Sequence, residues 1–374
     1  MSGLNFLNKL LDGVDVEWVT LGSIADIGTG SSNRQDESDN GTYPFFVRSK
    51  NILKSDTFEF DEVAIVIPGE GGVGDIFHYV EGKYALHQRA YRISIQSNSL
   101  ITKFVYHFML SSFKQYILMK SVGATAISIR KPMLEGFQVP IPCPDQPEKS
   151  LAIQSEIVRI LDKFNSLTAE LIAELTMRKK QYNYYRDQLM NLEEREDTRE
   201  MSIGDIYDFQ YGTGNTIPKS GGQYPVYGSN GIVGSHDKYN SEDSPVIGHI
   251  GAYAGIVNWG QGKHFVTYNG VICRHKSKEV LQKYAYHLLL LQDFGSKSNS
   301  ASQPFVSYNI LNAPIVLVPP LQEQARIVAI LDKFDTLTSS ITEGLPREIE
   351  LRQKQYEYYR DLLFSFPTSE AASN

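Results

Sequence analysis

Apolar side chains recur at alternating steps of four and three residues along the stretch 157–192. Such heptad spacing, kept for about five heptads, is typical of a helix in a coiled coil. Thr168 and Arg178 interrupt the seam, as polar residues do where they fix register or partner. The seam positions are Ile157, Leu161, Phe164, Thr168, Leu171, Leu175, Arg178, Tyr182, Tyr185, Leu189 and Leu192.

A second helical seam begins at Ile327, but its later part is displaced by four extra residues. Four residues make about one helical turn, so a stutter would keep the same face in line. Alternatively, Gly344 and Pro346 break the helix, and Pro346 opens the first turn of a new one. The seam positions are Ile327, Leu331, Phe334, Thr338, Ile341 and Leu345, then Tyr356, Tyr359, Leu363 and Phe366.

The two helical blocks are copies of one another. The segment Ile157–Phe164 recurs as Ile327–Phe334, and Gln181–Asp187 recurs as Gln355–Asp361, in the same order. A fainter similarity links the regions before them, where Tyr106-His107 aligns with Tyr286-His287. The chain is therefore an internal duplication, with two diverged blocks that alternate with two similar ones.

The diverged blocks are rich in Gly, Tyr, Asn and Ser and contain short alternating runs such as Glu62–Ile67 and Pro245–Ile250. These features predict compact β-rich domains with long loops, each with one helix, around Thr102–Met119 and Val280–Phe294. We expect an α+β fold with pseudo-two-fold symmetry, in which the two helical regions pair as an antiparallel coiled coil. The expected boundaries are 1–149 and 199–320 for the β-rich domains, 150–198 and 321–368 for the helical regions, and 369–374 for a tail.

Charge and composition narrow the function only slightly. The 374 residues include 36 Lys and Arg against 43 Asp and Glu, a net charge of −7, so no chain-wide basic field attracts nucleic acid. Residues 199–320 alone carry nine basic and eight acidic side chains, which leaves room for local polyanion binding. Only Cys143 and Cys273 occur, and no apolar run approaches the roughly 20 residues that span a bilayer. We expect a soluble cytoplasmic protein.

Signals of catalysis are weak. Gly69–Gly74 formally matches a dinucleotide-binding fingerprint, but Pro68 precedes it and Asp75–Val80 resembles a strand, not a helix start. We therefore expect a glycine-rich turn between strands, because the fingerprint needs a helix N-terminus to face the pyrophosphate. The histidines show no helical i, i+4 ligand pair, and the sequence has no Asn/Asp-Pro-Pro-aromatic methyltransferase loop. We expect neither a metal site nor a catalytic site.

The order of these motifs resembles that of the specificity subunits of type I restriction-modification systems (HsdS), over essentially the whole chain. The resemblance rests on Val16–Gly22, on Tyr43–Ile52, on Pro319–Gln324, and on the duplicated Leu-Asp-Lys-Phe and Tyr-Tyr-Arg-Asp motifs. The first helical block departs from the second between Pro144 and Gln154, which leaves the start of its helix open by several residues.

The resemblance implies two target recognition domains that read unlike halves of a bipartite, asymmetric site in double-stranded DNA. It implies that the helical regions dock methyltransferase subunits, two of them, and that restriction subunits join the full complex. The chain itself would be non-catalytic and would bind no cofactor, since S-adenosylmethionine, ATP and magnesium belong to its partners. The rival interpretation from the residues alone is a tandem ligand- or protein-binding β-module on a coiled-coil scaffold, whose binding would lack the steep salt dependence of DNA binding.

Candidate contact residues follow from the chemistry of base and phosphate recognition, which uses forked or planar donors and small hydroxyls. In the first domain they are Arg34, Arg48, Lys50, Asn51, Lys83, Gln88, Arg89, Ser128 and Arg130. In the second they are Lys219, Ser229, Asn230, His236, Lys263, His264, Tyr268, Asn269 and Ser307. Tyrosines on more than one helical face suggest a protein interface; the docking candidates are Tyr182, Tyr184, Tyr185, Tyr356, Tyr358 and Tyr359.

Overall fold

The structure is a computed structural model that describes residues 13–72, 74–120, 128–193, 195–214, 217–219, 221–298, 303–340 and 343–367. It divides into two compact units, one formed by residues 1–171 and 349–374 and the other by residues 172–348. The predicted tail 369–374 and the seam residue Ile341 lie outside the described residues. No helix among the described residues is both long and apolar enough to cross a membrane.

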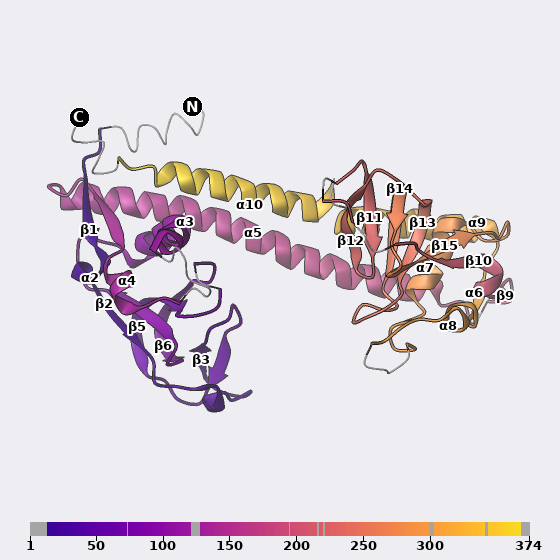
Figure 1. Cartoon of the computed structure of the whole chain (residues 1–374), viewed down its shortest axis with the longest axis horizontal. Coiled ribbons are helices and arrows are strands. Elements are labelled where there is room, and N and C mark those ends of the chain that lie inside the picture. The colour runs from indigo at the N-terminus through magenta and orange to yellow at the C-terminus, as the bar shows by residue number, and fades with distance from the viewer. Residues whose placement is uncertain are drawn as a thin grey trace. The chain divides into compact units, whose positions relative to one another are not determined.

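The first unit is built on a six-stranded sheet with the order β2-β7-β5-β6-β3-β4 (Figure 1). Its strands are β2 Ala25–Thr29, β3 Tyr43–Phe46, β4 Leu53–Ser55, β5 Phe60–Pro68, β6 His78–Leu86 and β7 Ala90–Ile95. A separate ribbon pairs β1 Val16–Thr20 with β8 Gln138–Pro142. The helices are α2 Leu21–Ile24, η1 Arg34–Asp36, α3 Thr102–Lys120 and α4 Lys131–Glu135.

The second unit repeats this plan strand for strand, with the order β10-β15-β13-β14-β11-β12. Its strands are β10 Tyr207–Tyr211, β11 Tyr224–Gly228, β12 Gly231–His236, β13 Ser241–Gly248, β14 Val257–Val266 and β15 Gly270–His275. The ribbon pairs β9 Arg199–Ser202 with β16 Ile315–Val318, and the helices are α6 Ile203–Ile206, α7 Gln282–Leu290 and α8 Tyr308–Asn312. We call the β-rich parts of the two units the first and the second module.

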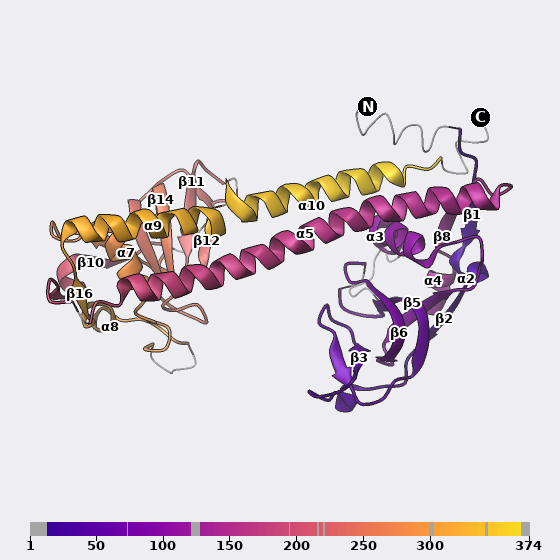
Figure 2. The same cartoon turned by 180° about the vertical axis from the view of Figure 1, so that it is seen from behind.

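The long helices are α5 Pro147–Met190, α9 Leu321–Ser339 and α10 Gly344–Leu363. In the first unit the start of α5 shares a core with the end of α10, and Phe164 stacks on Tyr359 at 5.3 Å. In the second unit the end of α5 shares a core with the start of α9, where Phe334 stacks on Tyr185 at 5.7 Å (Figure 2). The predicted antiparallel pairing is thus confirmed within each unit, and each repeat's phenylalanine meets the other repeat's tyrosine.

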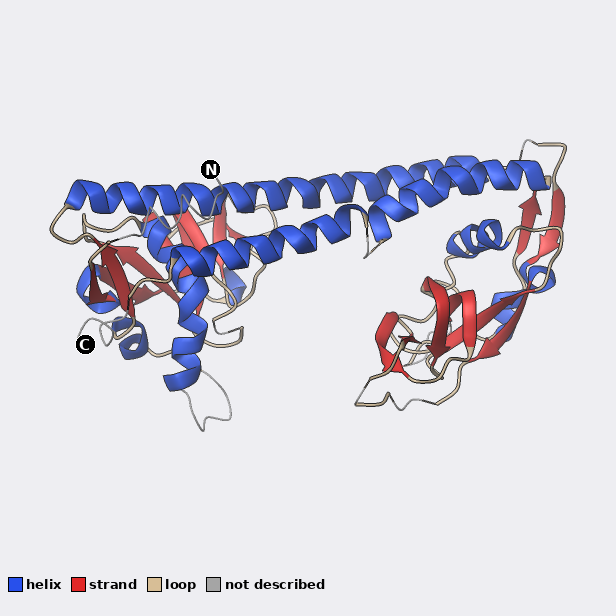
Figure 3. Cartoon of the chain, turned by 90° about the horizontal axis from the view of Figure 1, so that it is seen from above, coloured by secondary structure: helices blue, strands red, loops and turns tan. Residues whose placement is uncertain are grey.

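The extra residues of the second block interrupt the helix and do not form a continuous stutter. Helix α9 ends at Ser339 and α10 begins at Gly344, as two separate helices (Figure 3). Gly344 has φ +80°, a conformation that side-chain-bearing residues rarely adopt, and Pro346 lies in the first turn of α10. The alternative in which Gly344 and Pro346 break the helix is therefore correct.

A buried glutamine fastens each module to its helix in the same way. The side chain of Gln154 on α5 accepts a hydrogen bond from the Ile101 amide and donates one to the Ser99 carbonyl, both at 2.8 Å. Gln324 on α9 accepts from the Leu281 amide at 2.7 Å and donates to the Glu279 carbonyl at 2.9 Å. Helix α5 starts at Pro147. Although the sequence of this start differs from that of the second block, Gln154 makes the same contacts as Gln324.

Most local predictions for the modules are confirmed. The run Glu62–Ile67 lies in β5, Pro245–Gly248 lies in β13, and the expected helix at Thr102–Met119 is α3. Helix α7 is shorter than predicted, because it spans only Gln282–Leu290 of the expected Val280–Phe294. Between β5 and β6 the chain turns through Gly71, Gly72 and Gly74, all at positive φ, so the glycine-rich segment is the expected turn and not a phosphate-binding loop.

Candidate nucleic-acid interface

A parallel strand pair places two sequence-distant loops side by side in the first module. Strands β3 and β6 run parallel through Phe45–Ala85 and Phe46–Leu86, so their carboxyl ends coincide. The chain leaving β3 carries Arg48, and the chain leaving β6 carries His87, Gln88 and Arg89. The His87 amide donates to the Phe46 carbonyl at 2.9 Å, which fixes the two loops against each other.

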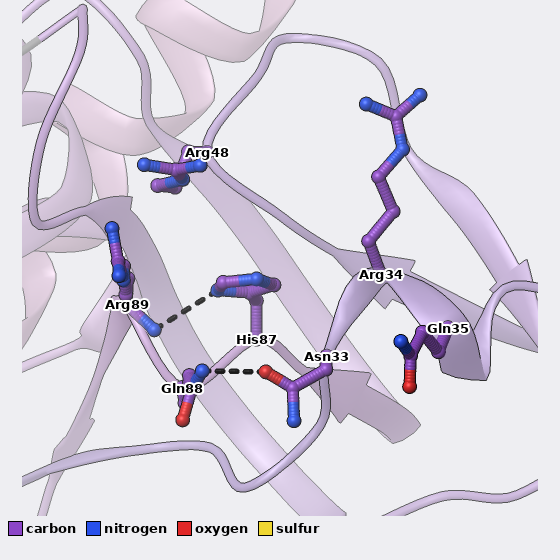
Figure 4. A pocket seen from close by; sticks show the side chains of 7 residues that line it. All are labelled: Asn33, Arg34, Gln35, Arg48, His87, Gln88 and Arg89. Atoms are coloured by element: carbon purple, nitrogen blue, oxygen red, sulfur yellow. Dashed lines mark hydrogen bonds between the residues drawn. The ribbon is translucent and has the colours of Figure 1, made fainter.

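Figure 4 shows the residues that line the first of two adjoining hollows beside these loops. The two hollows have volumes of about 510 and 620 Å³ and share Arg34, Arg48 and His87. Together we call them the arginine hollow. Five of the predicted contact residues line it, namely Arg34, Arg48, Asn51, Gln88 and Arg89. The remaining lining residues are Asn33, Gln35, Val47, Ser49, Leu53, Glu70, Gly71 and His87.

One carboxylate sits between two of the guanidinium groups. Arg48 Nη1 lies 3.4 Å from Glu70 Oε2, and Arg89 Nη1 lies 3.3 Å from Glu70 Oε1. Burial lowers the pKa of His87, and the nearby charges of Arg48 and Arg89 lower it further. The imidazole is therefore neutral at pH 7, and the positive charge of the hollow comes from its arginines.

Sequence reasoning did not select Glu70, because no local pattern in the sequence places it beside Arg48 and Arg89. Its backbone is held by an antiparallel bridge to Ser128, and the Ile129 amide donates to the Gly69 carbonyl at 2.8 Å. Ser128, a predicted contact, thus lies next to the hollow through its backbone. Glu70 lies at the start of the glycine-rich turn that follows β5, and this turn positions its side chain at the hollow.

The other predicted contacts of the first module lie elsewhere on it. Lys50 and Arg130 are exposed, and Arg130 immediately precedes α4. The ammonium of Lys83 lies over the Phe58 ring at 4.5 Å. None of the three is among the residues that line the arginine hollow.

The second module repeats the geometry with different side chains. Strands β11 and β14 are parallel through Val226–Phe265 and Tyr227–Val266, which brings Ser229 and Asn230 beside Tyr268 and Asn269. The Ser229 hydroxyl donates to the carbonyls of Ile250 and Asn269 at 2.9 and 3.1 Å. Four predicted contacts are therefore brought together, although Ser229 has a structural bond as well.

Aromatic rings, not charges, surround this second loop pair. Tyr211 stacks on His249 at 4.1 Å and on Tyr308 at 4.2 Å, and its ring centroid lies 6.4 Å from that of Tyr268. We call Tyr211, His249, Tyr268 and Tyr308 the aromatic cluster. Only Tyr268 was predicted from the sequence, because no local pattern marks rings that meet from four separate segments.

Several predicted contacts of the second module have structural roles. His264 is fully buried; its Nδ1 lies 2.8 Å from the Gly262 carbonyl, and burial lowers its pKa, so it offers nothing to a ligand and is removed from the candidates. The Ser307 hydroxyl caps α8 by accepting from the Ile310 amide. His236 stacks on Phe265 at 4.8 Å, and Lys263 lies over Tyr239 at 4.7 Å. Lys219 is exposed.

Four of the six helical tyrosines make contacts inside their own unit. Besides the stacked Tyr185 and Tyr359, the hydroxyls of Tyr182 and Tyr356 lie 3.3 and 3.4 Å from the Nδ1 atoms of His287 and His107. Tyr184 and Tyr358, which occupy equivalent positions, are the most exposed of the six, at 62% and 54%, and the stacked Tyr185 is 45% exposed. Docking through these tyrosines stays a prediction, and Tyr184 and Tyr358 offer it the largest exposed aromatic surface.

The histidine of the first module links three elements. His107 is buried on α3, and its Nε2 lies 3.0 Å from Asp162 Oδ1 on α5. An ionised carboxylate only accepts, so Nε2 donates and Nδ1 of the neutral ring accepts from Tyr356 on α10. Burial lowers the pKa of His107 and raises the pKa of Tyr356 to about 12, so both groups are neutral at pH 7.

Known proteins that resemble this chain do so along nearly its whole length. The family described as "Type I restriction modification DNA specificity domain" matches twice, at residues 13–177 and 195–351. The specificity subunit of the Escherichia coli type I restriction enzyme EcoR124I/EcoR124II is 37% identical, with all of both chains aligned. A putative specificity subunit from Haemophilus influenzae is 31% identical over 96% of this chain and 98% of its own.

Solved structures show the same fold. The S subunit of a type I restriction-modification system from M. genitalium superimposes with a TM-score of 0.63 at 20% identity. That superposition covers 96% of this chain and 98% of the other.

Proposed function

Because the chain belongs to the family of type I restriction-modification DNA specificity subunits, we propose that it selects the DNA sequence on which a type I complex acts. Each module reads one half of an asymmetric, bipartite target. The chain is the recognition component, and the catalytic steps belong to other subunits.

The observation that carries this proposal is a duplicated scaffold with unlike loops. The family match occurs once in each half of the chain, and the two sheets have the same strand order. At the equivalent loop ends, one module has arginines and the other has tyrosines and asparagines. Two modules that share a fold but differ in their loop side chains recognise two different half-sites.

In the first module, the arginine hollow contributes the base-reading groups, because Arg, Asn and Gln have the forked donors and acceptors that base edges require. The exposed Lys50 and Arg130 supply phosphate contacts that position the module on the duplex. In the second module, Asn230 and Asn269 read base edges. Tyr268 adds apolar contact, and Lys219 binds phosphate.

The helices dock the catalytic partners. Tyr184 and Tyr358 hold the same position in the two repeats, and an exposed aromatic pair of this kind is typical of protein interfaces. We propose one methyltransferase subunit per repeat, with restriction subunits that join through them. S-adenosylmethionine, ATP and magnesium are then bound by the partners.

The test is to co-express the chain with its methyltransferase subunit in a host without other adenine methylation and to map methylated adenines across the genome. A single split motif with unlike halves is the expected result. A stable complex that methylates no defined motif would contradict the specificity role and would favour a scaffold that binds protein or another ligand.

A further inference from the structure

The carboxylate of Glu70 is placed to take part in recognition. Glu70, Arg48 and Arg89 are about half exposed, at 44%, 44% and 54% of the side-chain surface. Each guanidinium has one nitrogen near one carboxylate oxygen, at 3.4 and 3.3 Å. Since an arginine has five donors and a carboxylate about four acceptor positions, all three groups keep bonding capacity for a ligand.

The carboxylate also selects the class of ligand. A phosphate placed against Arg48 and Arg89 would face the negative charge of Glu70 at close range. A base edge carries no net charge, and it can offer acceptors to the arginines and an amino group to the glutamate. The arrangement therefore favours base edges over backbone phosphates.

We propose that Glu70 is a specificity-determining residue that, together with Arg48 and Arg89, reads a G·C base pair in the major groove. One arginine donates to guanine O6 and N7, while the carboxylate of Glu70 accepts from cytosine N4, which lies beside O6 on the same edge. The second arginine holds the carboxylate in place. This inference rests on the proposed function, since it names the base pair that the first module reads.

The backbone around Glu70 supports such a fixed role. The bridge to Ser128 and the hydrogen bond from the Ile129 amide to the Gly69 carbonyl anchor the turn on one side. In the second module Ile250 makes the equivalent bridge, to Phe305, and has no charge to offer. The second module has Ile250 at the position of Glu70, so this carboxylate-based readout is confined to the first module.

The test compares the full chain with its Glu70→Gln variant, each in complex with methyltransferase subunits. Glutamine keeps the shape but has a single acceptor oxygen and no charge, so it cannot hold both arginines and still accept from cytosine. Methylated motifs are mapped, and affinities are measured for duplexes with the cognate pair or with A·T at each position. The matched control is Asp75→Asn, which removes one negative charge from an exposed ion pair with Lys114, outside the residues that line the hollow.

The wild-type motif is expected to contain a G·C pair in the first half, and the Glu70→Gln variant to lose about tenfold in discrimination at that pair alone. The second half-site and the Asp75→Asn motif should be unchanged. An unaltered motif in the Glu70→Gln variant, or a first half-site without a G·C pair, would overturn the inference. A wild-type complex without any motif would instead overturn the proposed function, so the two failures are distinct.

Discussion

The arginine hollow and the aromatic cluster occupy equivalent places in two modules with the same strand order, yet they have almost no chemistry in common. In the first, Arg48 and Arg89 flank Glu70. In the second, Tyr211 stacks between His249 and Tyr308, and Ile250 stands where Glu70 would be. The parallel strand pair beneath each site is the same. The difference shows that the scaffold fixes where the loops lie and leaves their side chains free to diverge.

What the modules share lies inside. The buried side chains of Gln154 and Gln324 make matching hydrogen bonds, and Phe164 and Phe334 make matching ring stacks with tyrosines of the other repeat. A surface loop can change its side chains without leaving a buried group unpaired, whereas a buried glutamine cannot be replaced without that penalty. Two modules that recognise unlike half-sites therefore need loops that can diverge and internal contacts that stay the same.

The largest expected loss of DNA affinity comes from changes in the loops, and it differs between the two modules. The double variant Arg48→Ala/Arg89→Ala should lose about 100-fold in affinity for the cognate duplex, because a base contact of this kind contributes about 1–3 kcal/mol. Asn230→Ala/Asn269→Ala should lose about tenfold, since neutral amides bond less strongly. Fluorescence-anisotropy titrations of the methyltransferase complex measure both affinities.

Each double variant should lose sequence discrimination only at the half-site that its own module recognises. Duplexes that carry one intact and one scrambled half-site provide the control within the same titration. If both double variants weakened binding to the same half-site, the assignment of one module to each half would be wrong.

Changes in the internal contacts should lower the stability of the chain, by the same amount in both modules. Gln154→Leu and Gln324→Leu each remove two hydrogen bonds to partly buried backbone groups, which lowers the free energy of unfolding by about 1–3 kcal/mol. Urea unfolding followed by fluorescence measures the loss. The control is Gln322→Leu, which changes an exposed glutamine on the same helix and should stay within about 0.5 kcal/mol of wild type.

Equal losses for the two buried positions would support a shared scaffold. A loss in one module only would show that the modules are fastened to their helices in different ways, despite matching bonds.

The smallest effect concerns the partner surface. Tyr184→Ala and Tyr358→Ala should each weaken binding of a methyltransferase subunit by about five- to tenfold, the loss of one aromatic contact at an interface. Because both side chains are exposed, the stability of the isolated chain should not change. Sedimentation or calorimetric titration measures the affinity, with Asn183→Ala as the neighbouring exposed control. An unchanged affinity in both variants would place the docking surface on another face.

Much of the scaffold was predictable from the sequence, because its signals are local or repeated. The heptad seam identified the long helices, and the copied motifs identified the duplication. The break at Gly344 was left open, since a four-residue insertion fits either a stutter or a new helix. Only the positive φ of Gly344 and the new start of α10 distinguish the two.

The binding sites were only partly predictable, because strand order decides which loops meet. Arg48 and Arg89 were selected separately for their chemistry, but the parallel pairing of β3 with β6 that joins them is non-local. Glu70 was missed because its role depends on its two neighbours and not on its type. Tyr182 and Tyr356 were placed both in the helical seam and among the docking candidates, since the sequence does not reveal that His287 and His107 are their partners.

The most direct test of the account exchanges residues 199–320 for the corresponding segment of the Escherichia coli relative and maps methylated adenines in a host that expresses the chimera with its methyltransferase subunit. The account predicts a motif in which one half is new and the other is identical to that of the wild-type complex. A motif altered in both halves would contradict the claim that the two modules read DNA independently on a common scaffold.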